Sequence, residues 1–189
     1  VNDVTSEVVV MTPYFIPGKA GVDFWRSIVD RGVRVVIVTN SLAANNHTAV
    51  HSGYARYRKD IIRAGVELFE ARADAVAAED KTMTMHTKAM IFDRESVFVG
   101  SLNLDPRSIA INSEMGVVVS SPEMTESLST RLFSNLPQWT YRVTLNEQGK
   151  LRWHANIDGE EVVGTKEPLA SWWRRFSAWF LRIAPENQL

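Results

Sequence analysis

The chain has 189 residues, 45% of them hydrophobic, which is enough to bury one core and argues for a single globular domain. Its formal charge of -1 provides no general basic field, so an interaction with phosphate must come from a local cluster of residues. The absence of cysteine excludes disulfides, zinc–thiolate sites and cysteine nucleophiles.

The first third of the chain alternates strand and helix patterns. It opens on Val1 with neither a Met nor a signal-like apolar run, so we expect this residue to be an artificial start. Residues 8–11 predict a buried strand, and a helix with a glycine stop leads to a valine-rich strand over 33–39. The same plan repeats and ends in a strand over 66–70. Two such β-α-β rounds predict a sheet that is parallel in part.

The middle of the chain predicts antiparallel pairing and a further helix. Residues 84–92 and 97–100 predict two strands joined by a short turn, and residues 115–119 predict another. A helical stripe of apolar residues follows from Ser121 and Pro122. The expected fold class is therefore α/β, a mixed central β-sheet flanked by helices. No stretch reaches the roughly 18 apolar residues of a membrane-spanning helix.

We expect residues 1–142 to form the main α/β unit and two smaller units to follow it. Turn signals between short β runs predict a small antiparallel appendage over 143–166. Residues 167–189 predict an amphipathic helix and tail, which suits the headgroup layer of a membrane but equally a docking surface for a missing part of the protein. Its apolar side holds Trp172, Trp173, Phe176, Trp179, Phe180 and Ile183, and its other side Arg174, Arg175 and Arg182.

A group of polar residues brackets the two central strands. His86 and Lys88 stand two residues apart, so on a strand both side chains point to the same face and converge on one phosphate. An imidazole can attack phosphorus or protonate a leaving alkoxide, and a lysine can neutralise the non-bridging oxygens. Ser101 and Asn103 add neutral donors, so this chemistry requires no metal and no other cofactor.

Two carboxylates belong to the same group. Glu114, on a neighbouring predicted strand, is expected to orient the His86 ring and favour its protonated form. Asp93 falls on the face opposite His86, so we expect it to organise the turn or bind backbone amides. The predicted catalytic set is His86, Lys88, Asp93, Ser101, Asn103 and Glu114.

Four further residues are candidates for substrate binding. His51, Tyr54 and Arg58 share one face of a predicted helix, which either lines a phosphate or headgroup pocket or packs in the core. Tyr14 ends a strand where pocket loops tend to lie, although an aromatic residue there more often packs. His47 and His51 lack a lysine two residues on, and His154 lies in a turn-rich stretch, so none of them can supply a second copy of the His-x-Lys pair.

The spacing of His86, Lys88 and Asp93 resembles the HxKxxxxD motif of the phospholipase D superfamily, and residues 100–103 match its GSxN element. Segments 12–17, 49–58 and 103–108 are similar to the C-terminal half of bacterial cardiolipin synthases, closest to the cardiolipin synthase C branch. Family members pair two motifs about a pseudo-twofold axis. One histidine forms a phosphohistidine, and the other acts as general acid and then as base. The resemblance implies that a half with the first motif lies outside this sequence and that His86 is the acid/base.

The resemblance implies a peripheral enzyme of the bacterial inner membrane that transfers a phosphatidyl group between phospholipids, giving cardiolipin. Its partners would be phospholipid substrates, the membrane surface and the missing N-terminal half. In one alternative, two copies of this chain pair their His86 residues as a homodimeric phosphodiesterase or nuclease. The balanced charge does not favour the basic groove that a nuclease needs, so nucleic acid is not an expected partner. In another alternative, the chain is a non-catalytic lipid-binding fragment.

Overall fold

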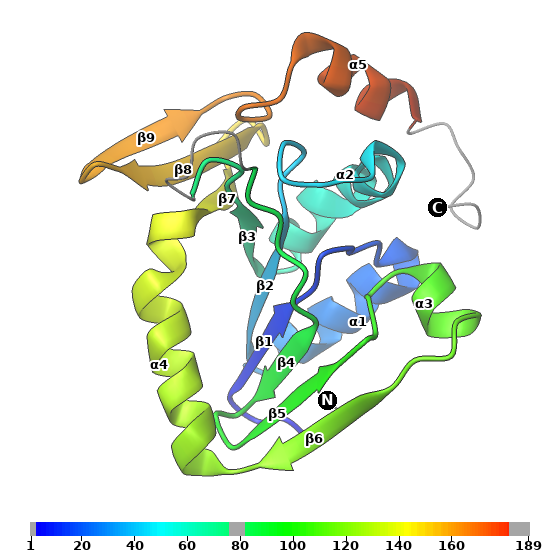
Figure 1. The fold of residues 1–189 in the computed structure, drawn as a ribbon, viewed down its shortest axis with the longest axis vertical. Helices are drawn as coiled ribbons and strands as arrows, with labels where there is room; N and C mark the ends of the chain where they lie inside the picture. Colours follow the sequence, from blue (N-terminus) through cyan, green and yellow to red (C-terminus); the bar gives the residue numbers. More distant parts are fainter. Residues whose placement is uncertain (1–2, 76–81, 182–189) are drawn as a thin grey trace.

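The structure, a computed structural model, describes residues 3–75 and 82–181. The described residues form one nine-stranded sheet in the order β6-β5-β4-β1-β2-β3-β7-β8-β9, with helices on both faces (Figure 1). This confirms the predicted α/β fold with a mixed sheet. The strands are β1 Glu7–Met11, β2 Arg34–Asn40, β3 Glu67–Ala71, β4 Ala89–Phe92, β5 Ser96–Gly100, β6 Gly116–Ser120, β7 Thr140–Leu145, β8 Leu151–Ile157 and β9 Glu160–Gly164. The helices are α1 Gly18–Asp30, α2 Thr48–Arg63, α3 Pro106–Ala110, α4 Pro122–Trp139 and α5 Trp172–Phe180.

The centre of the sheet is parallel and buried on both faces. β1 pairs with β2 and β2 with β3 in parallel, and α1 and α2 form the connections. Val8 and Val35 belong to the apolar cluster that includes residues of these helices, whereas Val9 and Val36 belong to a second cluster on the opposite face with residues of α4. Burial on both faces explains why these strands are continuous valine runs rather than alternating patterns.

The predicted strand over residues 84–92 is shorter than expected. Its regular part is β4, because the neighbouring strand β1 ends at Met11, which pairs with Ala89. Pro13 follows shortly after, and a proline cannot extend the ladder as a donor. The residues before β4 are held instead by a side chain, since the amide group of Asn40 donates to the Met85 carbonyl and accepts from the Met85 N–H, both at 2.9 Å.

Helix α4 starts as predicted, but of the predicted apolar stripe of Met124, Leu128 and Leu132 only Leu132 packs against the core. Ser121 caps it by accepting a hydrogen bond from the backbone of Met124. Thr125 and Ser129 are buried against the fold, whereas Met124 and Leu128 are 39% and 43% exposed. The apolar stripe on this helix is therefore left partly uncovered by the described residues.

The last three strands extend the main sheet. β7 pairs antiparallel with β3, so the predicted appendage continues the sheet, and β7 itself crosses the predicted boundary at residue 142. Val143 and Trp153 belong to the same core cluster as β1 and β2. α5 follows, while Arg182 and Ile183 of the predicted amphipathic helix lie outside the described residues. Within the described part of the chain, no helix combines the length and apolar character needed to cross a bilayer.

Candidate functional site

The side chains of His86 and Lys88 meet at the end of the sheet where β4 begins. Lys88 Nζ lies 3.2 Å from His86 Nε2, which confirms the predicted convergence although neither residue belongs to a regular strand. His86 is exposed and Lys88 half-buried. Burial lowers the pKa of Lys88, and the carboxylate of Glu114 opposes this shift. A basic pair open to solvent is suited to receive a phosphate group.

Glu114 contacts Ser101 rather than His86. Its carboxylate accepts hydrogen bonds from the Ser101 hydroxyl and, at 3.3 Å, from the Asn112 amide. No hydrogen bond joins Glu114 to the His86 ring among the described residues, so the orientation of that ring by Glu114 stays a prediction. The Ser101 hydrogen bond lowers the pKa of Glu114, and the charge of Lys88 adds to this effect. Glu114 therefore acts on this group through Ser101 and Lys88.

Gly100 allows β5 and β6 to lie close together next to Ser101. It stands opposite Gly116 in the β5–β6 pair. A Cβ atom on Gly100 would lie 2.5 Å from the Met115 carbonyl oxygen and 2.8 Å from the Phe98 ring. The next residue, Ser101, accepts a hydrogen bond from the Met115 N–H at 3.0 Å. The glycine of the GSxN element is thus required for close backbone contact.

Asn103 completes this side of the site. Its amide nitrogen lies 3.5 Å from the Ser108 hydroxyl. The Asn103 Oδ1 atom is buried and has no hydrogen-bond partner within the described residues. The side chain therefore presents an unused acceptor, whereas the sequence predicted a donor.

Asp93 lies at the far end of β4 from the catalytic pair and binds backbone amides, as predicted. Its carboxylate accepts from the N–H groups of Thr5, Ser6 and Glu7 at 2.8–2.9 Å. Burial raises the pKa of Asp93, but these hydrogen bonds outweigh burial and hold the pKa well below its usual range. Asp93 and Arg94 both have positive φ, 52° and 57°, in the turn between β4 and β5. Asp93 thus fixes this turn to the start of β1.

The substrate-pocket interpretation of His51, Tyr54 and Arg58 is wrong. All three side chains are buried, with relative exposures of 0%, 2% and 0%. Arg58 lies 2.9 Å from a Glu70 oxygen, 2.8 Å from a Glu167 oxygen and 2.9 Å from His51 Nε2. The Tyr54 hydroxyl donates to Glu70 at 2.7 Å. These residues form an internal ionic network that joins α2 to β3 and to the segment before α5.

Tyr14 is the fourth candidate, and it lies half-buried after β1. Its ring makes an edge contact with the His47 ring at a centroid distance of 5.7 Å. Burial, and then the Asp105 carboxylate, raise the pKa of Tyr14. The sequence missed Asn40, which holds the Met85 backbone next to His86. Its only signal was a polar residue ending a strand of valines.

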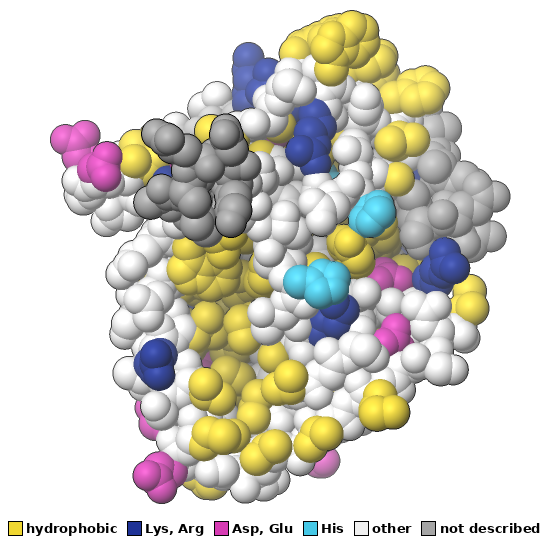
Figure 2. All heavy atoms as spheres, in the orientation of Figure 1, with side chains coloured by type: hydrophobic (Ala, Val, Ile, Leu, Met, Phe, Trp, Pro, Cys, Tyr) yellow, Lys and Arg dark blue, Asp and Glu magenta, His cyan; other side chains and the backbone are white. Residues whose placement is uncertain are grey.

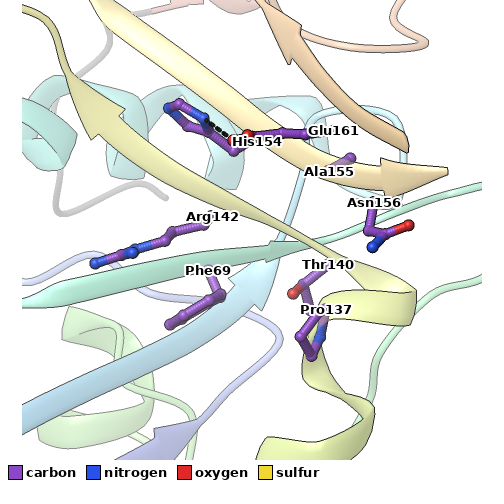
Figure 3. A pocket seen from close by; sticks show the side chains of 8 residues that line it. All are labelled: Phe69, Pro137, Thr140, Arg142, His154, Ala155, Asn156 and Glu161. Carbon is purple, nitrogen blue, oxygen red and sulfur yellow. Dashed lines mark hydrogen bonds and ion pairs between the residues drawn. The ribbon is translucent and has the colours of Figure 1, made fainter. Parts of the chain in front are cut away.

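A separate groove of about 350 Å³ lies over β7 and β8 (Figure 3). Figure 3 shows the His154 ring beside the Glu161 carboxylate, with Arg142 on the neighbouring strand, and the Nδ1–Oε1 distance is 3.0 Å. Phe69 forms part of its apolar wall. None of the predicted catalytic residues lines this groove. His154 therefore belongs to a different surface.

Comparison with known proteins gives consistent results. Residues 2–136 match the family described as "Cardiolipin synthase, PLD-like domain". The chain is 35% identical over 189 residues to cardiolipin synthase C of Escherichia coli (strain K12), covering 95% of this chain and 40% of that protein. Among solved structures, the phospholipase D family member Nuc of Salmonella typhimurium has a TM-score of 0.56 at 21% identity, covering 74% of this chain and 84% of Nuc. Phosphatidylserine synthase of Haemophilus influenzae Rd KW20 has a TM-score of 0.54 at 18% identity, covering 72% of this chain and 33% of that one. Both structures share the fold.

Proposed function

Because this chain belongs to the phospholipase D-like cardiolipin synthase family, we propose that it supplies one of two histidine half-sites in an enzyme that transfers a phosphatidyl group between phospholipids. The product would be cardiolipin, and the enzyme a peripheral protein of the bacterial inner membrane. The observation that carries the proposal is the pair of exposed His86 and half-buried Lys88, with 3.2 Å between its nitrogens. Since the chain spans 40% of cardiolipin synthase C, a second half-site has room in a longer protein.

The proposed reaction has two steps. A histidine of the second half attacks the phosphorus of a donor phospholipid, and its N–P bond forms while the bond from phosphorus to the leaving alcohol oxygen breaks. His86 donates a proton to that oxygen. His86 then takes the proton from a hydroxyl group of the acceptor lipid, whose oxygen attacks phosphorus while the N–P bond breaks and frees the histidine of the second half. His86 thus ends the cycle protonated, as it began.

The neighbours of His86 suit the charge that develops in this reaction. The Lys88 ammonium, beside the ring, would face the non-bridging oxygens of the phosphate. Glu114 lies close enough to influence the pKa of Lys88 and holds Ser101 by a hydrogen bond. In this proposal Glu114 and Ser101 position the lysine.

An exposed apolar surface next to this group offers a place for the second half. Met115 and Val117 are 82% and 62% exposed, and Ile109 and Ile111 nearby are also exposed. Met115 lies between Glu114 and the first residue of β6, which is a strand at the edge of the sheet. On the face drawn in Figure 2, further apolar side chains lie between α4 and the sheet. Uncovered apolar surface of this kind marks an interaction site.

A second candidate function uses the same site in a homodimer. Two copies of this chain would bring two His86 residues together across a twofold axis and cleave a phosphodiester by the same two steps with water as acceptor. The observation that favours it is the same exposed β6 surface, which a second copy would also cover.

The test compares the complete protein that carries this chain with the chain alone. Both are assayed for cardiolipin formation from phosphatidylglycerol and for DNA cleavage, with His86→Ala and, as a matched control, His154→Ala. We expect cardiolipin formation by the complete protein, a loss of about 100- to 10,000-fold with His86→Ala, and little change with His154→Ala.

The outcomes separate the candidates. Activity of the chain alone, as a dimer and on DNA, would favour the homodimeric phosphodiesterase. Cardiolipin formation that persists in the His86→Ala protein would contradict both candidates, because each requires this imidazole.

A further inference from the structure

The outer side of α5 is an aromatic surface that the described fold leaves uncovered. At about 100° per residue, its five aromatic residues fall within about 120° of the helix circumference. Their exposed fractions lie between 43% and 69%. The rings also contact one another, as in the stacked pair Trp172–Phe176 with centroids 5.6 Å apart. We call this surface the aromatic face: Trp172, Trp173, Phe176, Trp179 and Phe180.

The inner side of α5 is fixed to the domain. Ala178 is buried with Leu42 and Ala170 in a small apolar cluster. Arg174 donates to the carbonyl oxygens of Ala43, at 3.3 Å, and of Asn45. These contacts determine which side of the helix faces outward, so the exposure of the aromatic face follows from the packing of α5.

The helix rests on the same end of the sheet as the catalytic pair. Ala43 and Asn45 belong to the loop that follows β2. The last residue of β2, Asn40, holds the backbone of Met85, next to His86. A surface that touches the aromatic face therefore lies on the end of the molecule where the substrate must enter.

We propose that the aromatic face inserts into the headgroup region of a phospholipid bilayer and presents the catalytic end of the sheet to that bilayer. Three of its five residues are tryptophans, whose rings combine apolar area with an N–H donor and favour this interfacial layer. The described helix contains no acidic residue that an anionic lipid would repel. The inference rests on the proposed function, because only a lipid substrate requires this orientation.

The second half of the enzyme is a less suitable occupant of this surface. Figure 1 shows α5 and β6 at opposite ends of the long axis of the molecule. The apolar surface proposed for the second half lies at β6 and next to Glu114. The two apolar surfaces are therefore separate and can serve different partners at the same time.

The contacts of the arginines specify the kind of binding. Arg174 donates to backbone carbonyls of the loop after β2, and Arg175 lies 3.5 Å from the Glu167 carbonyl oxygen. The sequence left open whether this helix lies among lipid headgroups or docks on a missing part of the protein, and in the structure Arg174 and Arg175 bind the chain itself. Binding by the aromatic face should consequently depend on apolar insertion and only weakly on salt.

The experiment measures binding of the complete protein to vesicles of phosphatidylethanolamine and phosphatidylglycerol. Co-sedimentation is measured at 0.1 and 0.5 M NaCl, together with quenching of tryptophan fluorescence by brominated phosphatidylglycerol. The test variant combines Trp172→Ser, Trp173→Ser and Trp179→Ser. The control combines Val162→Ser and Val163→Ser, which are 47% and 48% exposed on β9.

We expect the tryptophan variant to lose quenching and to bind vesicles at least about tenfold more weakly, while the valine control and His86→Ala bind like the wild type at both salt concentrations. If the tryptophan variant melts at a lower temperature, Phe176→Ser with Phe180→Ser supplies the same comparison. Unchanged quenching, or binding abolished by salt alone, would overturn the inference.

A second assay separates this inference from the proposed function. Short-chain phosphatidylglycerol dispersed in water requires no bilayer, so the tryptophan variant should turn it over at the wild-type rate. Loss of this turnover would show that the aromatic face docks on the second half instead, and would overturn the inference. If the wild-type protein and all variants fail to form cardiolipin while vesicle binding still depends on α5, only the proposed function is refuted.

Discussion

The carboxylate of Asp93 accepts hydrogen bonds from three successive backbone N–H groups at the start of β1. The hydroxyl groups of Thr5 and Ser6 add two more, at 3.2 and 2.8 Å. Asp93 belongs to the same sequence motif as His86 and Lys88, yet it lies at the other end of β4. Its role in the structure is to hold the β4–β5 turn against the neighbouring strand.

We predict that Asp93→Asn lowers the free energy of unfolding by about 1–2 kcal/mol at pH 7, because an amide group would replace one acceptor oxygen with a donor in a partly solvated site. The folded-state pKa of Asp93 is lowered, so its contribution to stability is complete above the unfolded pKa of about 3.9. This contribution is lost as the pH falls toward the folded-state pKa. The difference between wild type and variant should therefore narrow below about pH 4 in urea unfolding experiments.

Asp158→Asn is the matched control for this prediction. Asp158 also has a positive φ, 53°, in a turn between two strands, but its carboxylate has no hydrogen bond among the described residues. We expect its replacement to change stability by less than about 0.5 kcal/mol. Equal losses at the two positions would show that the turn conformation, and not the amide contacts, makes Asp93 important.

The His86–Lys88 pair could be predicted from sequence because two residues at this spacing also meet outside a regular strand. The role of Glu114 could not. Whether it meets His86 or Ser101 depends on the order of β4, β5 and β6 in the sheet, which the local pattern does not contain.

At the scale of the elements, a buried ionic network joins α2, β3 and β8 to the segment before α5. The Trp153 indole on β8 donates to Glu70 at 2.8 Å, and Arg58 lies between Glu70 and Glu167. Burial would lower the pKa of Arg58, but the two carboxylates outweigh it and raise the pKa, so the arginine stays charged. Burial would likewise raise the pKa of Glu167, and Arg58 lowers it instead.

We predict that Arg58→Met destabilises the protein by about 3–5 kcal/mol, because it leaves two buried carboxylates without their cation. The control on the same helix is Arg63→Met, whose ion pair with Asp60 is 55% and 49% exposed and should contribute at most about 1 kcal/mol. Urea unfolding at pH 7 measures both. Similar losses for the two variants would contradict the structural role of the network.

This network also shows why the sequence left open whether His51, Tyr54 and Arg58 line a pocket or pack in the core. A polar helix face is equally consistent with a pocket and with a buried network, and the choice depends on partners far along the chain. Glu167 lies 109 residues from Arg58, and neither periodicity nor local motifs connect the two. The same reason applies to β7, whose hairpin pattern was visible but whose pairing with β3 was not.

At the scale of the whole molecule, the sheet ends in two edge strands, each paired on one side only, with different surroundings. β6 lies near the catalytic group and β9 at the opposite edge, and both expose valines. Val118 on β6 is 62% exposed and Val162 on β9 is 47% exposed. Only the edge at β6 adjoins the group around Glu114, so the proposed second half should need this edge and not the other.

We predict that Val118→Lys lowers cardiolipin formation by the complete protein at least about tenfold with an almost unchanged melting temperature, because a lysine charge would be buried when the two halves close. Val162→Lys should leave the activity near that of the wild type. The measurement is a lipid product assay beside a thermal melt. Full activity of the Val118→Lys protein would exclude this edge as the contact surface.

The paired hydrogen bonds between Asn40 and the backbone of Met85 bear on how two halves would associate. The Asn40 side chain makes the two hydrogen bonds that a neighbouring strand would make to Met85, because the pairing of β1 with β4 ends at Met11 and Ala89. The segment with His86 is thereby ordered before any second lobe arrives. Association of the two halves would then cost less conformational entropy than it would if the segment with His86 were disordered. More of the free energy of the contacts would therefore remain as affinity.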